Sequence, residues 1–326
     1  MLWGGIGMKR IIAALLATAM VLCLCACAAP TQETHEKLSV MCTLFPYYDF
    51  VRVIGGEDVD AQLLVTAGRE THSFEPTPLD VVALSRADVL ICNGGESEVW
   101  VEDILGAAGE NISAVVRMMD YADTLEEEVV EGMQVHEESA EEDDGHGEEI
   151  EYDEHIWTSP VIAMELCRVI CDTLCSADPG HAENYRQRLA DYLAELKKLD
   201  ADFRDVVSHA QRRLVVFGDR FPLLYFCKTY GLDYRAAFHG CSGDTEPSLA
   251  TLKYLIDKVN AEDIPVVYTI ELSSQKIAEA IAETTGAQVR TFYSCQSISR
   301  ADFDAGETYL SLMQRNVTAL KEGLDG

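Results

Sequence analysis

Basic residues are scarce in this chain of 326 residues, which has 25 Lys and Arg against 56 Asp and Glu and a formal net charge of −31. Such an excess of negative charge repels a phosphate backbone, which argues against nucleic acid as a partner. The same electrostatic field attracts cations. The composition therefore favours a protein whose ligand is positively charged.

Several signatures of catalysis are also missing. The chain has no nucleophile elbow, no Gly-rich phosphate loop, no HExxH motif and no dinucleotide fingerprint. A metallohydrolase would also need a general base beside an open metal site, and only spare acids such as Glu75 and Glu154 are available for that role. We therefore expect a binding protein rather than an enzyme.

The chain lacks an apolar run long enough to be a good membrane-spanning helix. The run in MKRIIAALLATAMVLCLCAC (residues 8–27) is about a dozen residues long, against roughly 20 for a span. The basic pair before it and the small residues after it are typical of a secretory signal. Leu24-Cys25-Ala26-Cys27 resembles a bacterial lipobox, with an ordinary cleaved signal as the alternative. We expect a signal peptide at 1–26, a lipid anchor on Cys27 and a tether at 27–36.

The eight cysteines beyond the signal show no CxxC spacing, which excludes a zinc ribbon. Cys167, Cys171 and Cys175 recur every four residues, a spacing that places them on one helix face as small core residues. Cys241 and Cys295 lie in loops of the second half, and in an exported protein they could form a disulfide.

Short apolar runs alternate with helical patterns in both halves of the chain. Strands are expected at 38–45, 61–65, 88–92, 213–217, 234–238, 265–270 and 289–292. Strands that alternate with helices indicate an α/β fold with parallel sheets and functional loops at the strand ends.

A single long helix is expected between the two halves. Residues 181–210 contain no Gly or Pro, and their apolar residues have the spacing of an amphipathic helix about 45 Å long. The chain should therefore form two lobes, each with a mostly parallel sheet flanked by helices, at 37–178 and 211–326. The linking helix at 179–210 should be rigid and should limit the motion of the lobes to small tilts and loop rearrangements.

An acidic tract interrupts the first lobe. Residues 126–154 hold fifteen acids and two histidines, His136 and His146, and no basic residue. Such a segment cannot bury enough apolar surface to offset its ordering entropy, so residues 124–154 should form a disordered loop. The loop either collects divalent cations by weak binding or is only solvated.

Two histidines stand out as candidate metal ligands. His72 lies in the loop sequence GRETHSFEPTPLD, where an isolated histidine is most often a surface residue. His155 lies in DEHIWTSP, where Ile156 and Trp157 look anchored in a core. Ser159-Pro160 after them has the pattern of a helix start. A histidine fixed by buried neighbours is the better ligand candidate of the two.

These motifs resemble a known family. THSFEPTPLDVVALSRADVLICNGG, DEHIWTSP and the tail YLSLMQRNVTALKEGL are similar to the cluster A-I metal-binding lipoproteins, the zinc or manganese solute-binding proteins of ABC importers. The resemblance covers nearly the whole chain after the signal. It implies that two histidines of the first lobe, here His72 and His155, and two residues of the second lobe bind one metal ion in the interlobe cleft.

The second-lobe ligands are where the sequence departs from the family pattern. The third ligand usually follows the strand after the long helix, where this chain has Gly218, with Asp219 beside it. The resemblance therefore implies Asp219, with His239 as the rival. For the fourth ligand it implies Glu271, at the place where zinc-binding members can carry a glutamate, although the segment is one residue shorter here. The aspartate ligand of other members falls near Tyr293, which is a poor ligand.

The resemblance implies a function as well as a site. We expect an extracytoplasmic, high-affinity Zn²⁺ receptor that is anchored to the cell membrane, acts as a monomer and delivers the ion to an ABC permease. Imidazoles with carboxylates suit Zn²⁺ and also Mn²⁺, and the general affinity order favours zinc. The alternatives are a manganese receptor of the same importer class and a surface adhesin.

Overall fold

The computed structural model describes residues 37–109, 112–134, 151–242 and 246–325. The predicted signal peptide, Cys27, the tether, His136 and His146 lie outside these residues. Among the described helices, none combines the length and the apolar character that a membrane crossing requires. Both sheets described below belong to one unit of the chain, Leu38–Gly326.

The first half folds around a four-stranded parallel sheet in the order β2-β1-β3-β4. Its strands are β1 Leu38–Cys42, β2 Val59–Leu63, β3 Val89–Cys92 and β4 Ala114–Arg117. The strands predicted at 38–45, 61–65 and 88–92 are confirmed with shifted ends, and β4 was not predicted. Every residue of β3 is buried, as expected of a parallel strand covered on both faces.

Four helices accompany this sheet: α2 Phe45–Gly55, α3 Pro78–Leu84, α4 Trp100–Ala108 and α5 Pro160–Ala177. Pro46 lies in the first turn of α2, where its missing N–H has no intrahelical partner to lose. Ser159 occupies the N-cap of α5 as predicted, but its hydroxyl pairs with that of Thr229 at 2.8 Å rather than capping the helix. Short 3₁₀ turns complete the half at η1 Gly56–Asp58, η2 Glu96–Glu98, η3 Met118–Tyr121 and η5 Ile156–Thr158.

The second half repeats the plan with a parallel sheet in the order β6-β5-β7-β8. Its strands are β5 Leu214–Phe221, β6 Asp233–His239, β7 Val266–Thr269 and β8 Gln288–Thr291. Its helices are α7 Leu224–Tyr230, α8 Leu249–Ala261, α9 Lys276–Thr285, α10 Arg300–Asp304 and α11 Tyr309–Asp325. In both sheets the chain reverses its direction of strand addition beside a central strand, which is where ligands bind in open α/β sheets.

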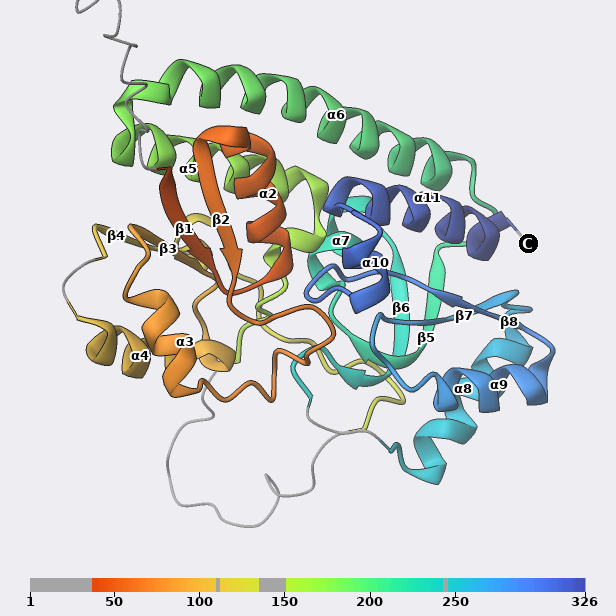
Figure 1. The fold of residues 1–326 in the computed structure, drawn as a ribbon. Coiled ribbons are helices and arrows are strands. Elements are labelled where there is room, and N and C mark those ends of the chain that lie inside the picture. The colour runs from red at the N-terminus through yellow and green to blue at the C-terminus, as the bar shows by residue number, and fades with distance from the viewer. Residues whose placement is uncertain (1–36, 110–111, 135–150, 243–245, 326) are drawn as a thin grey trace, which may run out of the picture. The chain divides into compact units, whose positions relative to one another are not determined.

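The predicted long helix is confirmed as α6 Ala182–His209, which follows the 3₁₀ turn η6 Pro179–His181. It packs against α2 and α5 of the first half and α11 of the second (Figure 1). Its buried face belongs to one hydrophobic core that also takes in residues of both sheets, such as Val40 and Phe217. The two lobes are therefore tied by shared packing as well as by the chain connection.

One expectation for the loops is wrong, and a possibility that the sequence left open is answered. The ends of the 124–154 segment are ordered rather than disordered, because Glu126 forms a bridge with Tyr152 and the N–H of Asp153 donates to the carbonyl of Leu125 at 2.9 Å. Residues 135–150 lie outside the described part. Cys241 and Cys295 are free thiols rather than a disulfide.

The four-residue cysteine spacing is confirmed as core packing. Cys167 and Cys171 are buried in the main hydrophobic core, and Cys175 packs partly buried against it. All three lie on α5, whose buried face meets α6 and α2.

Candidate metal site between the lobes

His155 is held by a rigid and fully buried backbone. Ile156 and Trp157, which form the turn η5 after it, have no exposed surface. The indole N–H of Trp157 donates to the carbonyl of Ser294 at 2.8 Å, and its own carbonyl accepts from the hydroxyl of Tyr309. Contacts from the second half therefore fix the position of a first-half histidine.

Asp153 sets the orientation of the His155 ring. Its Oδ1 lies 2.8 Å from the backbone nitrogen of His155 and 3.2 Å from Nδ1. A proton on Nδ1 leaves Nε2 with a free lone pair, the arrangement that metal-bound histidines usually show. Nε2 is buried and has no hydrogen-bond partner in the described part of the chain.

Charge and burial oppose each other at His155. Burial alone would lower its pKa, but the negative charges of Asp153, Glu154 and Glu127 outweigh that effect and raise the pKa above its ordinary value. These acids stabilise positive charge on or beside the ring. A metal ion bound to the neutral ring would provide that positive charge in place of a proton.

The loop after β3 supports the same segment. The side-chain amide of Asn93 donates to the carbonyl of Glu154 at 3.0 Å. Oε2 of Glu98, which is buried, accepts from the backbone N–H groups of Asn93 and Gly94 at 2.7 and 3.0 Å. The carboxylate of Glu154 accepts from both the backbone and the hydroxyl of Ser97. Both oxygens of Glu154 are therefore held by Ser97, which ties the segment before His155 to the loop after β3.

His72 lies beside His155, with 5.7 Å between the ring centroids. Burial, together with the positive charges of His155 and Arg220, lowers the pKa of His72 to about 4, so its ring is neutral at pH 7. Its Nε2 accepts from the side-chain amide nitrogen of Gln296 at 3.1 Å. The lone pair that a metal would use is thus directed at a loop of the second half.

Gly218 cannot be replaced by a ligand-bearing residue. A Cβ atom at this position would lie 2.5 Å from Cα and 2.6 Å from the nitrogen of Ala278, which belongs to the backbone of α9. The place that the family resemblance assigns to the third ligand is therefore closed by helix packing. A ligand from this strand has to come from a neighbouring position.

Asp219 lies within β5, at an irregularity in its pairing with β6 between Phe217 and Arg220, rather than after the strand as predicted. Both oxygens of its carboxylate accept hydrogen bonds from the chain. Oδ2 accepts from the Thr269 hydroxyl and the Ile270 N–H at 2.7 and 3.2 Å, and Oδ1 accepts from the N–H of Arg220 at 2.9 Å.

The carboxylate of Glu271 also accepts hydrogen bonds from the chain. Glu271 directly follows Ile270, just beyond the end of β7. Its two carboxylate oxygens accept from the N–H and the hydroxyl of Ser294, at 2.8 and 2.6 Å. Burial raises its pKa, and the hydrogen bonds from Ser294 oppose that rise. The loop that carries Ser294 also carries Gln296, so one loop contacts both Glu271 and His72.

His239, the rival third ligand, is the last residue of β6. Its Nδ1 pairs with the carboxylate of Glu127, which comes from the acidic tract. Within the described ranges, Glu127, Glu151 and His239 are the one group of three or more acids, histidines or cysteines whose ligand atoms all lie within 4.8 Å of one another.

A cavity of about 800 Å³, here called the interlobe cavity, brings some of the predicted residues together. His72 and Asp219 line it, as do Glu70 and Arg220, which form an ion pair across it at 2.9 Å. His155 lies against His72. The structure therefore places the two histidines side by side and Asp219 on the same cavity, and it leaves Glu271 bonded to Ser294.

Sequence reasoning missed Gln296 and the pair of Glu70 and Arg220. Glu70 stands two residues before His72, and Arg220 directly follows Asp219. Because Glu70 and Arg220 have opposite charges and each lies beside a candidate ligand, the sequence could have predicted that they pair. Nothing in the sequence links Gln296 to a histidine more than two hundred residues away.

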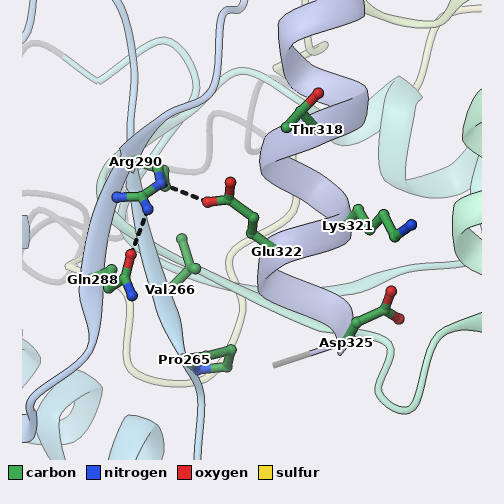
Figure 2. Close-up of a pocket in the computed structure, with 8 residues that line it drawn as sticks. All are labelled: Pro265, Val266, Gln288, Arg290, Thr318, Lys321, Glu322 and Asp325. Carbon is green, nitrogen blue, oxygen red and sulfur yellow. Dashed lines mark hydrogen bonds and ion pairs between the residues drawn. The ribbon is translucent and has the colours of Figure 1, made fainter.

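A second cavity, of about 500 Å³, lies between the edge strand β8 and α11 (Figure 2). Arg290 lines it from the β8 side, with Nε 2.6 Å from the Glu322 carboxylate of α11 and a further hydrogen bond to Gln288. None of the predicted ligands lines it. The interlobe cavity is thus the one that matches the sequence-based site.

Two parallel-sheet lobes bridged by one long helix, with paired histidines beside the cavity between them, define a solute-binding protein of the two-lobed α/β class. More particularly, the chain belongs to the family described as "Zinc-uptake complex component A periplasmic", whose model matches residues 40–323.

Relatives of known name agree with this assignment. Zinc-binding lipoprotein AdcA of Streptococcus pneumoniae is 31% identical over 325 residues, which is 98% of this chain but only 62% of that protein. The chain thus spans less than two thirds of that relative. The high-affinity zinc uptake system protein ZnuA of Bacillus subtilis is 30% identical over 294 residues, covering 89% of this chain and 88% of that one.

A solved structure matches the fold closely. The Zn(II)-bound ZnuA-like domain of Streptococcus pneumoniae AdcA has a TM-score of 0.70 at 28% identity, with 89% of this chain and 100% of that chain covered. The predicted fold class, two lobes with parallel sheets and a long linking helix, is confirmed.

Proposed function

We propose that this chain is an extracytoplasmic receptor that binds Zn²⁺ through His72 and His155 and delivers it to an ABC permease. The observation that carries the proposal is the buried, unpartnered Nε2 of His155 beside the ring of His72. An unsatisfied buried polar atom costs about 1–3 kcal/mol, and a cation that replaces a proton on this nitrogen would recover that cost. Family membership and the zinc-binding names of relatives support the choice of cargo.

Zinc is the better fit of the two candidate ions. Neutral imidazoles suit borderline cations, and the low pKa of His72 keeps its ring neutral. Binding strength at such sites generally rises from Mn²⁺ to Zn²⁺. Manganese remains the alternative cargo.

Asp219 and Glu271 are the proposed second-lobe ligands, with His239 as the alternative to Asp219. A set of four protein ligands would leave no open coordination position, which suits carriage of the ion rather than catalysis. For Glu271 to bind, its carboxylate would have to exchange the bonds from Ser294 for the metal. The proposed change is local, as expected where the lobes share a core.

The remaining features of the proposal come from the sequence. A lipid anchor on Cys27 and the tether 27–36 would hold a monomeric receptor at the outer face of the cell membrane. The lobes would be bounded at 37–178 and 211–326, with the linking segment 179–210 between them. Limited proteolysis of the mature protein would test these boundaries.

Isothermal titration of the metal-free protein with Zn²⁺ and with Mn²⁺ tests the central claim. One tight Zn²⁺ per chain is expected, and His72→Ala and His155→Ala should each weaken it by more than about 100-fold, since loss of an outer-shell partner alone costs 10–100-fold. His209→Ala, at an exposed histidine on the last turn of α6, is the control. Zinc binding no tighter than micromolar, or unchanged in both variants, would refute the proposal.

A second set of variants separates the proposed ligands of the second lobe. Asp219→Ala, Glu271→Gln and His239→Ala are titrated with Zn²⁺ alongside thermal unfolding of the metal-free forms. A true ligand loses zinc affinity in excess of any loss of stability. Deletion of residues 135–150 should leave the tight site intact, because the ordered contacts of Glu127 and Asp153 remain.

A further inference from the structure

A fixed positive charge lies in the cavity that we propose for a cation. Arg220 lines the interlobe cavity together with His72, and 17% of its side chain is exposed. The other basic residue of the lining, Lys276, is exposed at the start of α9. Like charges repel more strongly where water is excluded, so a guanidinium here lowers the affinity for any cation bound nearby. The contacts of Arg220 therefore bear on how strongly the cavity can hold an ion.

Arg220 is held at the cavity by contacts with two segments. Its guanidinium donates to Oε2 of Glu70 at 2.9 Å, and a longer hydrogen bond of 3.5 Å runs to the carbonyl of Ser242. The register shift of β5 against β6 ends at Arg220, where pairing with Phe238 resumes. Irregularities of this kind redirect side chains next to functional sites. The guanidinium thus has a fixed place between a first-half loop and a second-half strand.

The ion pair as a whole repels positive charge at His72. Burial and the charge of His155 are the largest causes of the lowered pKa of His72, and the positive charge of Arg220 comes next. The negative charge of Glu70 acts in the opposite direction, but more weakly than that of Arg220. A divalent ion on the ring would meet the same imbalance as a proton, with twice the charge. Arg220 therefore opposes metal binding at His72 even while it is paired.

The carboxylate of Glu70 is a potential metal donor beside His72. Glu70 stands two residues before His72 and lines the same cavity. Burial raises its pKa, but the charge and the hydrogen bond of Arg220, followed by the charge of His72 and a bond from its backbone, outweigh burial and lower the pKa. Glu70 is therefore ionised at neutral pH, and its carboxylate is a harder donor than an imidazole.

Fold stability does not account for the pair. Glu70 keeps 38% of its side chain exposed, and ion pairs in contact with water contribute little to stability. What the pair changes is the set of charges and donors around His72. With Arg220 in place the Glu70 carboxylate faces a guanidinium, and without it the same carboxylate would be available to a metal ion.

We propose that Arg220 sets both the affinity and the selectivity of the interlobe site. Its charge repels the bound ion, which keeps the site weak enough to give the ion up. Its hydrogen bond with Glu70 holds a hard carboxylate away from the metal, which shifts the preference of the paired histidines toward Zn²⁺ and away from Mn²⁺. The inference rests on the proposed function for the location of the ion, and Arg220 acts without touching the metal.

Titration of Arg220→Gln with Zn²⁺ and with Mn²⁺ tests the proposal, with a chelator as competitor where binding is tight. Affinity for Zn²⁺ should rise at least about tenfold, because removing a neighbouring like charge changes cation affinity by about one power of ten or more. Affinity for Mn²⁺ should rise by a larger factor, since the Glu70 carboxylate becomes available. Release of Zn²⁺ to a chromogenic chelator should slow accordingly.

Further variants separate the charge from the hydrogen bond. Arg220→Lys keeps the charge and should resemble the parent. Glu70→Gln leaves the guanidinium unbalanced, so it should weaken binding of both ions, and it decides the test if Arg220→Gln does not fold. Adding Arg220→Gln to Glu70→Gln should raise both affinities by the same factor, because no carboxylate remains to be released. Arg290→Gln, which removes the same charge from the ion pair with Glu322 in the second cavity, is the matched control and should match the parent.

Unchanged or lower zinc affinity in a folded Arg220→Gln would overturn the inference, leave the proposed function intact and make Arg220 only a contact between the lobes. Equal gains for the two ions would also overturn it, since Glu70 would then not be withheld from the metal. If the parent binds no zinc tightly, while Arg220→Gln still strengthens the binding of both ions and that of Mn²⁺ more, the proposed function fails and the inference stands.

Discussion

On the first-lobe side of the interlobe cavity, His155 keeps a buried ring nitrogen without a partner in the described part of the chain. On the second-lobe side, both carboxylate oxygens of Asp219 and of Glu271 accept hydrogen bonds. The first side thus keeps one unsatisfied ring nitrogen among the described residues, while the acids of the second side are satisfied by hydrogen bonds from their own chain.

The difference indicates an order of events. A cation can reach the histidines at the cost of one hydrogen bond, that from Gln296 to His72. Binding to Glu271 in addition requires its bonds with Ser294 to break. Because the shared core resists a wide hinge, we infer that the 293–297 loop moves rather than the lobes.

The largest expected effect concerns Glu98, the buried acid that supports the first-lobe side. Burial raises its pKa from 4.5 to about 7. A carboxyl that holds its proton more tightly when folded stabilises the fold at low pH, and this contribution is lost as the pH rises from about 4.5 to 7. Glu98→Gln keeps an acceptor and removes the titration. Between pH 4.5 and 8 the metal-free variant should gain about 3 kcal/mol in unfolding free energy relative to the parent.

Chemical denaturation at several pH values measures this difference. Glu96→Gln, at an exposed acid of the same turn, is the control and should follow the parent. A constant difference between Glu98→Gln and the parent would show that Glu98 is ionised throughout and that the first-lobe side is less sealed from water than its burial indicates.

The next effect tests whether Asp153 orients the His155 ring. Asp153→Ala removes the acceptor for both the backbone N–H and Nδ1, so zinc affinity should fall about 10–100-fold. Asp153→Asn keeps an acceptor oxygen and should lose less. Titration with Zn²⁺ measures both variants. Equal losses in the two would mean that the charge of Asp153 matters and its hydrogen bonds do not.

A third variant tests the claim that the acids on the second-lobe side already have their hydrogen bonds. In Asp219→Asn the new amide group must face a donor, either the N–H of Arg220 or those of Thr269 and Ile270. The metal-free protein should lose about 1–3 kcal/mol of unfolding free energy. Asp123→Asn, at an exposed aspartate of the first half, should be neutral. Unchanged stability with impaired zinc binding would instead mark Asp219 as a ligand that is free to move.

The sequence predicted what depends on local pattern. The strands other than β4, the helix α6 and the fixed position of His155 follow from apolar periodicity and from Ile156-Trp157. The pairing of the two histidines came from the family motifs. It failed where distant segments meet. That Asp219 lies within β5, and that Ser294 bonds Glu271, depends on contacts between separate elements with no local signature. The ordered ends of the acidic tract escaped prediction because Tyr225 and β6 hold them.

The smallest expected effect is a gain in zinc affinity, and it concerns the hydrogen bond that joins the two sides of the cavity. Gln296 donates to the nitrogen of His72 that a metal would use, so it competes with the ion. Gln296→Ala removes that competitor, and a hydrogen bond of about 1 kcal/mol corresponds to a rise of about fivefold in zinc affinity. Gln187→Ala, at an exposed glutamine on α6, is the control for titration with Zn²⁺. A loss of affinity in Gln296→Ala would mean that the amide supports the bound state, and that the 293–297 loop closes on the metal instead of yielding to it.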